Sequence, residues 1–218
     1  MIMDELKATL KTRGFYIYYL FLVMGFFILF LTDKGDFLLW LNAHHNATSD
    51  FFFKYWTHLG DGLIFAFLGI LFLLTSYFRT LVLIIAVISQ TMIIQGLKRF
   101  VFGDIVRPRL FFENFDALYH VPGVEIHSSN SFPSGHTATA FTVAVLLTLM
   151  MKKKNLSSIL MSMAILVGLS RVYLLQHFFI DIYFGSLIGF LIGIITYTLM
   201  ESSSLSGKSS LKRGLLVK

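Results

Sequence analysis

Three ionisable residues interrupt an otherwise apolar stretch near the C-terminal end of the sequence. The stretch Ser170–Asp181, SRVYLLQHFFID, contains Arg171, His177 and Asp181. His177 and Asp181 are four positions apart, so they are neighbours on a helix. An aspartate that accepts a hydrogen bond from one imidazole nitrogen fixes the tautomer and leaves the other nitrogen as a nucleophile. Arg171 could reach the same site if the intervening turn is irregular. The alternative is a structural Arg–Asp pair with an incidental histidine.

A second group of polar residues lies in the stretch FPSGHTATAF, Phe132–Phe141. Pro133 ends a loop, and Ser134 and Gly135 open a helix. Exposed backbone N–H groups at a helix N-terminus, beside a hydroxyl and a glycine, form a cradle for phosphate. His136 follows immediately, in a position to exchange a proton with a bound group. In the alternative interpretation, Ser134 is only an N-cap and His136 is a polar residue at the membrane interface.

A third group is the stretch KRFVFGDIVRPR, Lys98–Arg109, which contains four cations in twelve residues. Lys98 and Arg107 together indicate an anion site, because arginine offers a planar fork of donors and lysine a point charge. Arg99 and Arg109 could instead be anchors whose charged ends extend to the membrane surface.

Together the three groups predict phosphoryl transfer through a phosphohistidine intermediate. His177, the histidine with a carboxylate partner, would attack phosphorus. His136, for which we expect no such partner, would protonate the leaving oxygen and then act as base toward water. The developing charge would be stabilised by cations and donors from all three groups, namely Lys98, Arg107, Arg171, Ser134 and the backbone N–H of Gly135. We expect no metal or other cofactor, because no clear carboxylate cluster is present to hold magnesium.

The chain that carries these residues is too apolar for a soluble domain. Of its 218 residues, 56% are hydrophobic and 14% are charged, whereas about a quarter of a soluble domain is charged. This composition predicts an all-α, polytopic integral membrane protein. The absence of cysteine from the sequence excludes disulfides and thiolate metal sites.

Six apolar runs are long enough, or nearly so, to cross a hydrocarbon core of about 30 Å as helices. They are Phe15–Leu31, Leu63–Phe78, Thr80–Leu97, Thr137–Met151, Asn155–Ser170 and Ile182–Met200. We therefore expect a six-helix membrane-embedded domain over residues 15–200, a cytoplasmic N-terminal segment over 1–14 and a disordered, cytoplasmic basic tail over 201–218. The aromatic segment between the first two runs, with Trp40 and Trp56, predicts interfacial helices at headgroup level.

The distribution of basic residues predicts the orientation of the spans. With the N-terminus in the cytoplasm, 11 of the 18 Lys and Arg residues lie inside, among them Lys152, Lys153 and Lys218. Five of the remaining seven belong to the three groups above, and all seven histidines lie outside. Both termini are then cytoplasmic. The net charge of +6 indicates contacts with anionic lipid headgroups, not with nucleic acid.

The motifs resemble those of the type 2 phosphatidic acid phosphatase superfamily of membrane lipid phosphatases. Pro133–His136 matches its Pro-Ser-Gly-His motif, and Ser170–Asp181 matches its Ser-Arg-x5-His-x3-Asp motif without departure. The Lys-to-Arg-Pro motif departs, because the eight residues between Lys98 and Arg107 exceed the family's usual spacing. Either the loop is longer here or Arg99 takes the place of Lys98.

The resemblance covers roughly residues 15 to 200 and implies that His177 is the nucleophile, His136 the acid and base, and Asp181 the residue that orients His177. It implies a lipid phosphate substrate in the outer leaflet, reached at the periplasmic or exterior face of a bacterial inner membrane. Undecaprenyl diphosphate, phosphatidylglycerophosphate, phosphatidic acid and lipid A phosphate remain open as substrates. Two other functions also remain open, vanadate-dependent haloperoxidase chemistry and non-catalytic phospholipid or phosphate transport.

Overall fold

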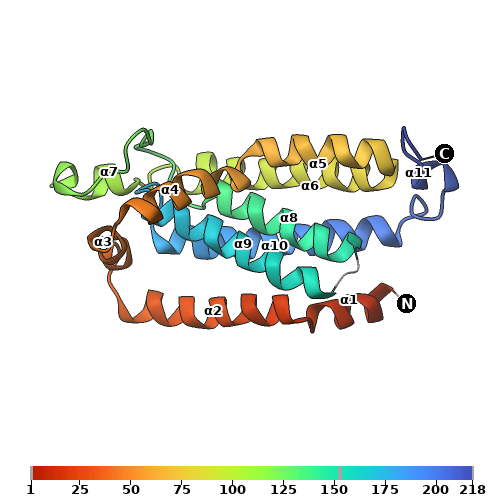
Figure 1. Cartoon of the computed structure of the whole chain (residues 1–218), viewed down its shortest axis with the longest axis horizontal. Helices are drawn as coiled ribbons and strands as arrows, with labels where there is room; N and C mark the ends of the chain where they lie inside the picture. Colours follow the sequence, from red (N-terminus) through yellow and green to blue (C-terminus); the bar gives the residue numbers. More distant parts are fainter. Residues whose placement is uncertain (1, 152–153, 218) are drawn as a thin grey trace.

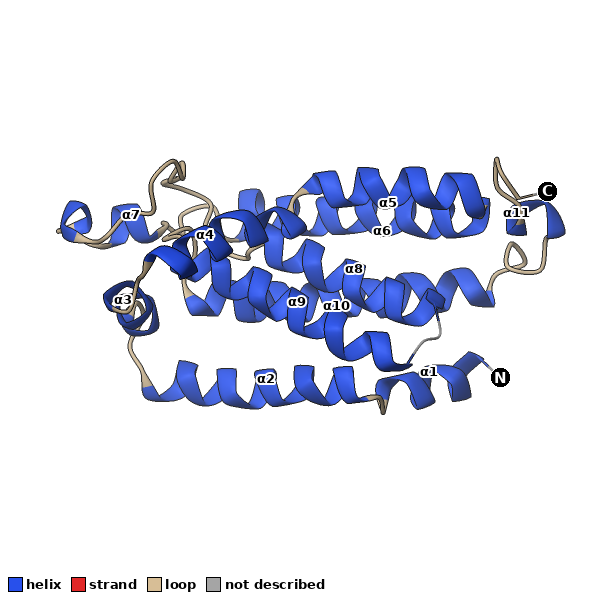
Figure 2. Ribbon diagram, in the orientation of Figure 1, coloured by secondary structure: helices blue, strands red, loops and turns tan. Residues whose placement is uncertain are grey.

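The computed structural model describes residues 2–151 and 154–217. Lys152, Lys153 and Lys218, three of the predicted inside charges, lie outside the described residues. Within these ranges all regular structure is helical (Figure 2). The long helices run along the longest axis of the molecule, with both chain ends at one end and the short helices α3, α4 and α7 at the other (Figure 1).

The elements in chain order are α1 (Ile2–Leu10), α2 (Arg13–Leu31), α3 (Asp36–Ala43), α4 (Ala47–Trp56), the 3-10 turn η1 (Thr57–Gly60), α5 (Gly62–Thr75), α6 (Tyr77–Gly96), the π-helical turn η2 (Leu97–Val101), α7 (Pro108–Phe111), the 3-10 turn η3 (Phe115–Ala117), α8 (Gly135–Met151), α9 (Lys154–Tyr173), α10 (Phe179–Ser202) and α11 (Ser209–Lys212). The expected helices between the first two apolar runs are α3 and α4.

Four helical segments are long and apolar enough to cross a membrane: α2, α6 with η2, α9 and α10. The segment from α4 through η1, joined to α5 at a bend of 56°, would make a fifth span, and α8 is shorter at 17 residues. Large apolar side chains are exposed on the outer faces, such as Phe30 and Met92 at 74% and 70%. Such surfaces suit contact with lipid. The chain therefore has the helical membrane architecture that its composition predicted, while the number of six spans stays a prediction.

The second predicted run, Leu63–Phe78, has the wrong C-terminal boundary. The run contains the end of α5 and the start of α6, which are separated by Ser76 alone. Ser76 has an extended backbone, and its hydroxyl accepts a hydrogen bond from the N–H of Arg79 at 3.4 Å. A serine that caps the following helix ends the preceding one, so α5 and α6 form a tight hairpin.

The C-terminal segment differs from the disorder that we expected after residue 200. Helix α10 continues to Ser202, and α11 follows after a turn. The N–H groups of Leu215 and Leu216 then donate to the carbonyls of Leu73 and Leu74, at 3.1 and 2.9 Å. Backbone hydrogen bonds to the end of α5 thus order a segment whose polar composition alone indicated disorder.

Helix α8 lies at the centre of the bundle and packs against α9 and α10. Gly185, Gly189 and Gly193 of α10 face it at four-residue spacing. A Cβ atom at Gly185 would lie 2.7 Å from the carbonyl oxygen of Ser134, and one at Gly189 would collide with the backbone of Ala138. Small residues allow two helix backbones to approach closely. This contact sets the first turn of α8 beside the first turn of α10.

We expect Gly189→Ala to destabilise the protein by about 1–3 kcal/mol, because overpacking a close contact forces the backbone to move. Gly69→Ala is the matched control, since its Cβ would meet only Leu83 Cδ2 at 3.9 Å. That change should preserve stability or raise it by roughly 0.5–1 kcal/mol through helix propensity. Thermal unfolding midpoints in one detergent measure the difference, and equal midpoints would contradict the packing of α8 on α10.

Candidate active site

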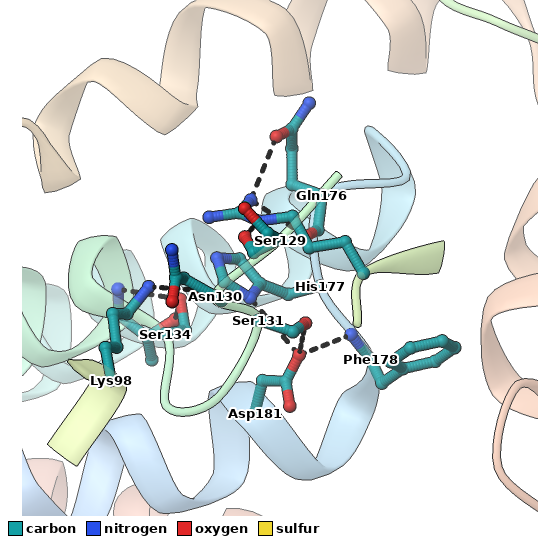
Figure 3. A network of polar contacts seen from close by, with 11 residues as sticks. Lys98, Ser129, Asn130, Ser131, Ser134, Gln176, His177, Phe178 and Asp181 are labelled. Carbon is teal, nitrogen blue, oxygen red and sulfur yellow. Dashed lines mark hydrogen bonds and ion pairs between the residues drawn. The ribbon is translucent and has the colours of Figure 1, made fainter. Parts of the chain in front are cut away.

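His177 and Asp181 are in contact at the start of α10 (Figure 3). The Nδ1 atom of His177 lies 3.2 Å from Oδ2 of Asp181. The same oxygen accepts hydrogen bonds from the N–H of Phe178 at 3.0 Å and from the hydroxyl of Ser131 at 2.5 Å. Because the carboxylate accepts, the Nδ1 atom carries the proton and Nε2 keeps its lone pair. Nε2 has no hydrogen-bond partner among the described residues.

The contact forms at a helix N-terminus, not along a helix as we expected. His177 precedes α10, whereas Asp181 lies in its first turn. The carboxylate reaches back to the N–H of Phe178, as an acidic residue at this position commonly does. Asp181 therefore both caps the N-terminus of α10 and orients the ring of His177.

An irregular turn at the end of α9 brings Arg171 close to His177. Leu175 has a φ of 57°, and the N–H groups of Gln176 and His177 both donate to the carbonyl of Arg171, at 2.9 and 3.1 Å. The chain therefore reverses directly after α9, as the spacing of Arg171 and His177 required. The guanidinium donates to the hydroxyl of Thr57 at 2.8 Å, while its buried Nε has no partner among the described residues.

Lys98 and Arg107 are both buried beside this turn. The ammonium group of Lys98 donates to the carbonyl of Asn130 at 2.8 Å. Arg99 is exposed, so Lys98 is the cation that faces the buried cluster. The π-helical turn η2 and the loop after it accommodate the long spacing between Lys98 and Arg107.

Arg107 is held by three oxygen atoms from neighbouring loops. Its guanidinium donates to the carbonyl of Ser129 at 2.8 Å, and to the carbonyl and side-chain oxygens of Gln176 at 3.0 and 3.2 Å. Figure 3 shows Gln176 and Ser129 on one side of the His177 ring and Asp181 on the other. The sequence pattern did not predict a role for Gln176, although its polar side chain next to His177 in an apolar stretch was an available signal.

Burial and the cations of this cluster change the pKa values of His177 and Arg107. Burial and the positive charges of Arg107, Arg171 and Lys98 hold the pKa of His177 well below its usual value. Burial likewise lowers the pKa of Arg107. His177 is therefore neutral at neutral pH, the state that a nucleophilic imidazole needs. The cluster carries an excess of positive charge that a phosphate group would offset.

The first turn of α8 adds hydrogen-bond donors to this cluster. Helix α8 begins at Gly135, as predicted. The hydroxyl of Ser134 accepts from the N–H and the hydroxyl of Thr137, at 3.4 and 2.9 Å, so Ser134 is the N-cap. Its own proton remains available to donate. The N–H groups of Gly135 and His136 donate to no acceptor within the described ranges, which leaves them for an anion.

His136 has a carboxylate partner, so our expectation that it lacks one was wrong. Its Nε2 atom lies 2.6 Å from Oδ1 of Asp61, and the Nδ1 atom of His58 lies 2.7 Å from Oδ2 of the same residue. The hydrogen bond from His136 is the main cause that lowers the pKa of Asp61 to about 2. Asp61 lies far from His136 in the sequence and in none of the three motifs, so residue spacing could not pair them.

Residues 79–204 match the model of the PAP2 superfamily, which is more than half of the chain. The chain belongs to the PAP2 superfamily. This finding confirms the resemblance predicted from the motifs at residues 98–107, 133–136 and 170–181. The PAP2 match begins in the first turn of α6 and ends just beyond α10, so it contains all three motifs.

Solved structures and a curated relative agree with this PAP2 assignment. The structure of LpxE from Aquifex aeolicus is 30% identical, with a TM-score of 0.65, over 75% of this chain and 94% of that one. A PAP2 type phosphatidylglycerolphosphate phosphatase from Bacillus subtilis shares the fold, at 23% identity and a TM-score of 0.61, over 87% of this chain and 96% of that one.

Bacitracin transport permease protein BcrC from Bacillus licheniformis is 28% identical over 132 residues, or 56% of this chain. The match spans 64% of BcrC, less than two thirds of its length. The chain is thus an integral membrane protein of a lipid phosphatase family.

The burial of neutral His177 predicts a pH dependence of stability. Below about pH 6.5 the unfolded chain binds a proton at this residue that the folded ring does not, so stability falls by up to about 1.4 kcal/mol per pH unit. His177→Asn removes the titrating group, and its stability should fall less steeply than that of the wild type between about pH 6.5 and pH 5. Thermal midpoints in phosphate-free detergent solution provide the measurement. Parallel curves for the two proteins would show that His177 is not buried in its neutral form.

Proposed function

We propose that the protein is a metal-independent lipid phosphatase that works through a phosphohistidine intermediate. The observation that carries the proposal is the environment of His177. Its ring is buried, Asp181 fixes its Nδ1–H, and Nε2 is without a partner among the described residues. Three cations, Lys98, Arg107 and Arg171, influence its ionisation from close by. A neutral nucleophile beside a cluster with an excess of positive charge suits attack on a phosphate group.

In the first step Nε2 of His177 attacks phosphorus and the bond to the leaving oxygen breaks. His136 gives a proton to that oxygen, so the alcohol or phosphate product leaves protonated. In the second step His136 takes a proton from water as the water attacks the phosphohistidine, which releases inorganic phosphate and free His177. The charge on the equatorial oxygens is stabilised by the three cations and by the donors of Ser134 and Gly135.

The side chains available at the site support a mechanism without a metal ion. Within the described ranges, no group of three or more His, Asp or Glu side chains has an arrangement that could hold a metal ion. Both aspartates at the site are bonded to histidines. A divalent cation would also meet the positive charge of Lys98, Arg107 and Arg171.

We further propose six spans, formed by α2, α5, α6, α8, α9 and α10, with both termini in the cytoplasm. The two termini share one end of the molecule, and α3, α4 and α7 lie at the opposite end (Figure 1). The excess of Lys and Arg in the segments assigned to the cytoplasm favours this orientation. The site then faces the periplasm or the exterior of a bacterial inner membrane.

An apolar cavity beside Asp181 supports a lipid substrate. The cavity has a volume of about 500 Å³ and lies between the end of α6 and the start of α10. Its lining is apolar apart from two ionisable side chains; it consists of Lys34, Leu97, Phe102, Ile105, Phe132, Ile180, Asp181, Phe184 and Ile188. An acyl or prenyl chain could occupy this cavity while its phosphate reaches the cationic cluster, with access from the outer leaflet. The four candidate substrates are undecaprenyl diphosphate, phosphatidylglycerophosphate, phosphatidic acid and lipid A phosphate.

Transport without catalysis is a second candidate, favoured by the name of the Bacillus licheniformis relative, a transport permease protein. The two His–Asp pairs argue against it, because binding an anion requires cations but no oriented nucleophile. Flux of a phospholipid or phosphate across liposomes without release of inorganic phosphate would favour transport.

The decisive experiment measures phosphate release from the four lipid classes by purified protein in the presence of EDTA. We expect turnover of at least one class, and His177→Asn should reduce it by at least about 1,000-fold. His127→Asn is a matched control at an exposed loop histidine and should retain wild-type turnover. Equal turnover by wild type and His177→Asn, or no turnover of any class by the wild type, would refute the proposal.

A further inference from the structure

The turn between α4 and α5 lies outside the three motifs, yet it contacts two residues of the site. This segment, residues 57–61, is here called the Asp61 turn. Thr57 is buried, and its hydroxyl accepts a hydrogen bond from Arg171 at 2.8 Å. At the other end of the turn, Oδ1 of Asp61 lies 2.6 Å from Nε2 of His136. One short segment therefore holds both an arginine and a histidine of the site.

The Asp61 turn packs tightly against the first turn of α8. A Cβ atom at Gly60 would lie 2.8 Å from the carbonyl oxygen of His136 and 2.7 Å from Cγ1 of Val167. Only glycine fits these distances without movement of the neighbours, so the approach of the turn to His136 depends on Gly60. The close packing of the two backbones thus places Asp61 beside His136.

Charged groups face His136 from several elements. The long loop between η2 and α8, residues 102–134, contains Arg107. This arginine and Arg171 of α9 oppose a positive charge on the ring, as does His177 when protonated. Asp61 favours that charge, and His58 shares the carboxylate of Asp61. The Nδ1 atom of His136 has no hydrogen-bond partner among the described residues. Asp61 therefore contacts Nε2 of His136 and leaves Nδ1 available.

We propose that Asp61 is a positioning residue for the proton transfers of His136. It keeps a proton on Nε2, directs Nδ1 toward the leaving oxygen, and stabilises the imidazolium form among the surrounding cations. This proposal rests on the proposed function, in which His136 is the acid and base. When the leaving group departs, the proton on Nδ1 moves to its oxygen and Nε2–H stays bonded to Asp61. In the second step Nδ1 takes a proton from water, and Asp61 remains ionised throughout.

The first test is the pH dependence of turnover in Asp61→Asn, which keeps the shape of the side chain but removes its charge. We expect kcat to fall at least about tenfold with little change in KM, because an oriented acid acts in the transition state. The alkaline limb of the kcat profile should move to lower pH, because the charge that favours the protonated ring is gone. Asp61→Glu, which keeps the charge, should return the limb toward its wild-type position.

Asp116→Asn is the matched control, since it makes the same change at an exposed carboxylate in the long loop. Its kcat and pH profile should equal those of the wild type. An Asp61→Asn profile that coincides with the wild type would overturn the proposal. So would equal shifts in Asp61→Asn and Asp61→Glu, because the effect would then not depend on the charge.

The second test needs no turnover and so separates this proposal from the proposed function. Nitrogen NMR of protein labelled in its histidine rings reports the tautomer of each ring, and His136→Gln identifies the signal of His136. We expect neutral His136 to carry its proton on Nε2, and Asp61→Ala to give a mixture of tautomers. A proton on Nδ1 in the wild type would overturn the role of Asp61. If the wild type shows the Nε2 tautomer but releases no phosphate from any lipid, the pairing stands and the phosphatase proposal fails.

Discussion

The central constraint on this structure is the burial of three cations at one end of a membrane bundle, where none of them forms a salt bridge among the described residues. Lys98, Arg107 and Arg171 are bonded to carbonyl, amide and hydroxyl oxygens. Neutral acceptors orient a cation while its charge stays available, whereas a salt bridge would offset that charge internally. A buried charge of this kind is costly in a membrane protein and commonly marks a functional site. A bound anion would offset the free-energy cost of this burial.

The two carboxylates of the site, Asp61 and Asp181, are bonded to imidazole rings and not to the cations. The two His–Asp pairs are not equivalent. Asp181 bonds to Nδ1 of His177, whereas Asp61 bonds to Nε2 of His136, so the two rings have opposite nitrogens free. Their exposures differ as well, at 1% for the side chain of His177 and 33% for that of His136. A deeply buried, neutral ring suits nucleophilic attack, and a partly exposed ring can exchange protons with water. The different environments of these two histidines thus favour the different roles proposed for them.

The packing of α8 against α10 fixes the relative positions of the residues at the site. The close contact of α8 with the glycines of α10 joins the helix that starts at Gly135 to the helix whose first turn contains Asp181. The N–H of Ser134 donates to the carbonyl of Asp181 at 3.0 Å, which links the two helix starts directly. Asp181 also lines the apolar cavity. The position of the first turn of α8 relative to the apolar cavity therefore follows from helix packing.

Local sequence pattern was sufficient to predict the apolar helices, the start of α8 at Gly135, and the motifs that contain His136, His177 and Asp181. Spacing within one short segment constrains geometry, so these residues could be recognised without coordinates. Local pattern could not distinguish two adjacent cations such as Lys98 and Arg99, and the packing of the chain shows that Lys98 is the buried one. Packing also brings together distant segments, as with Asp61 and His136 and with the C-terminal segment and the end of α5. Those contacts depend on how helices pack, and helical periodicity reports which face of a helix is apolar but not which partner that face meets.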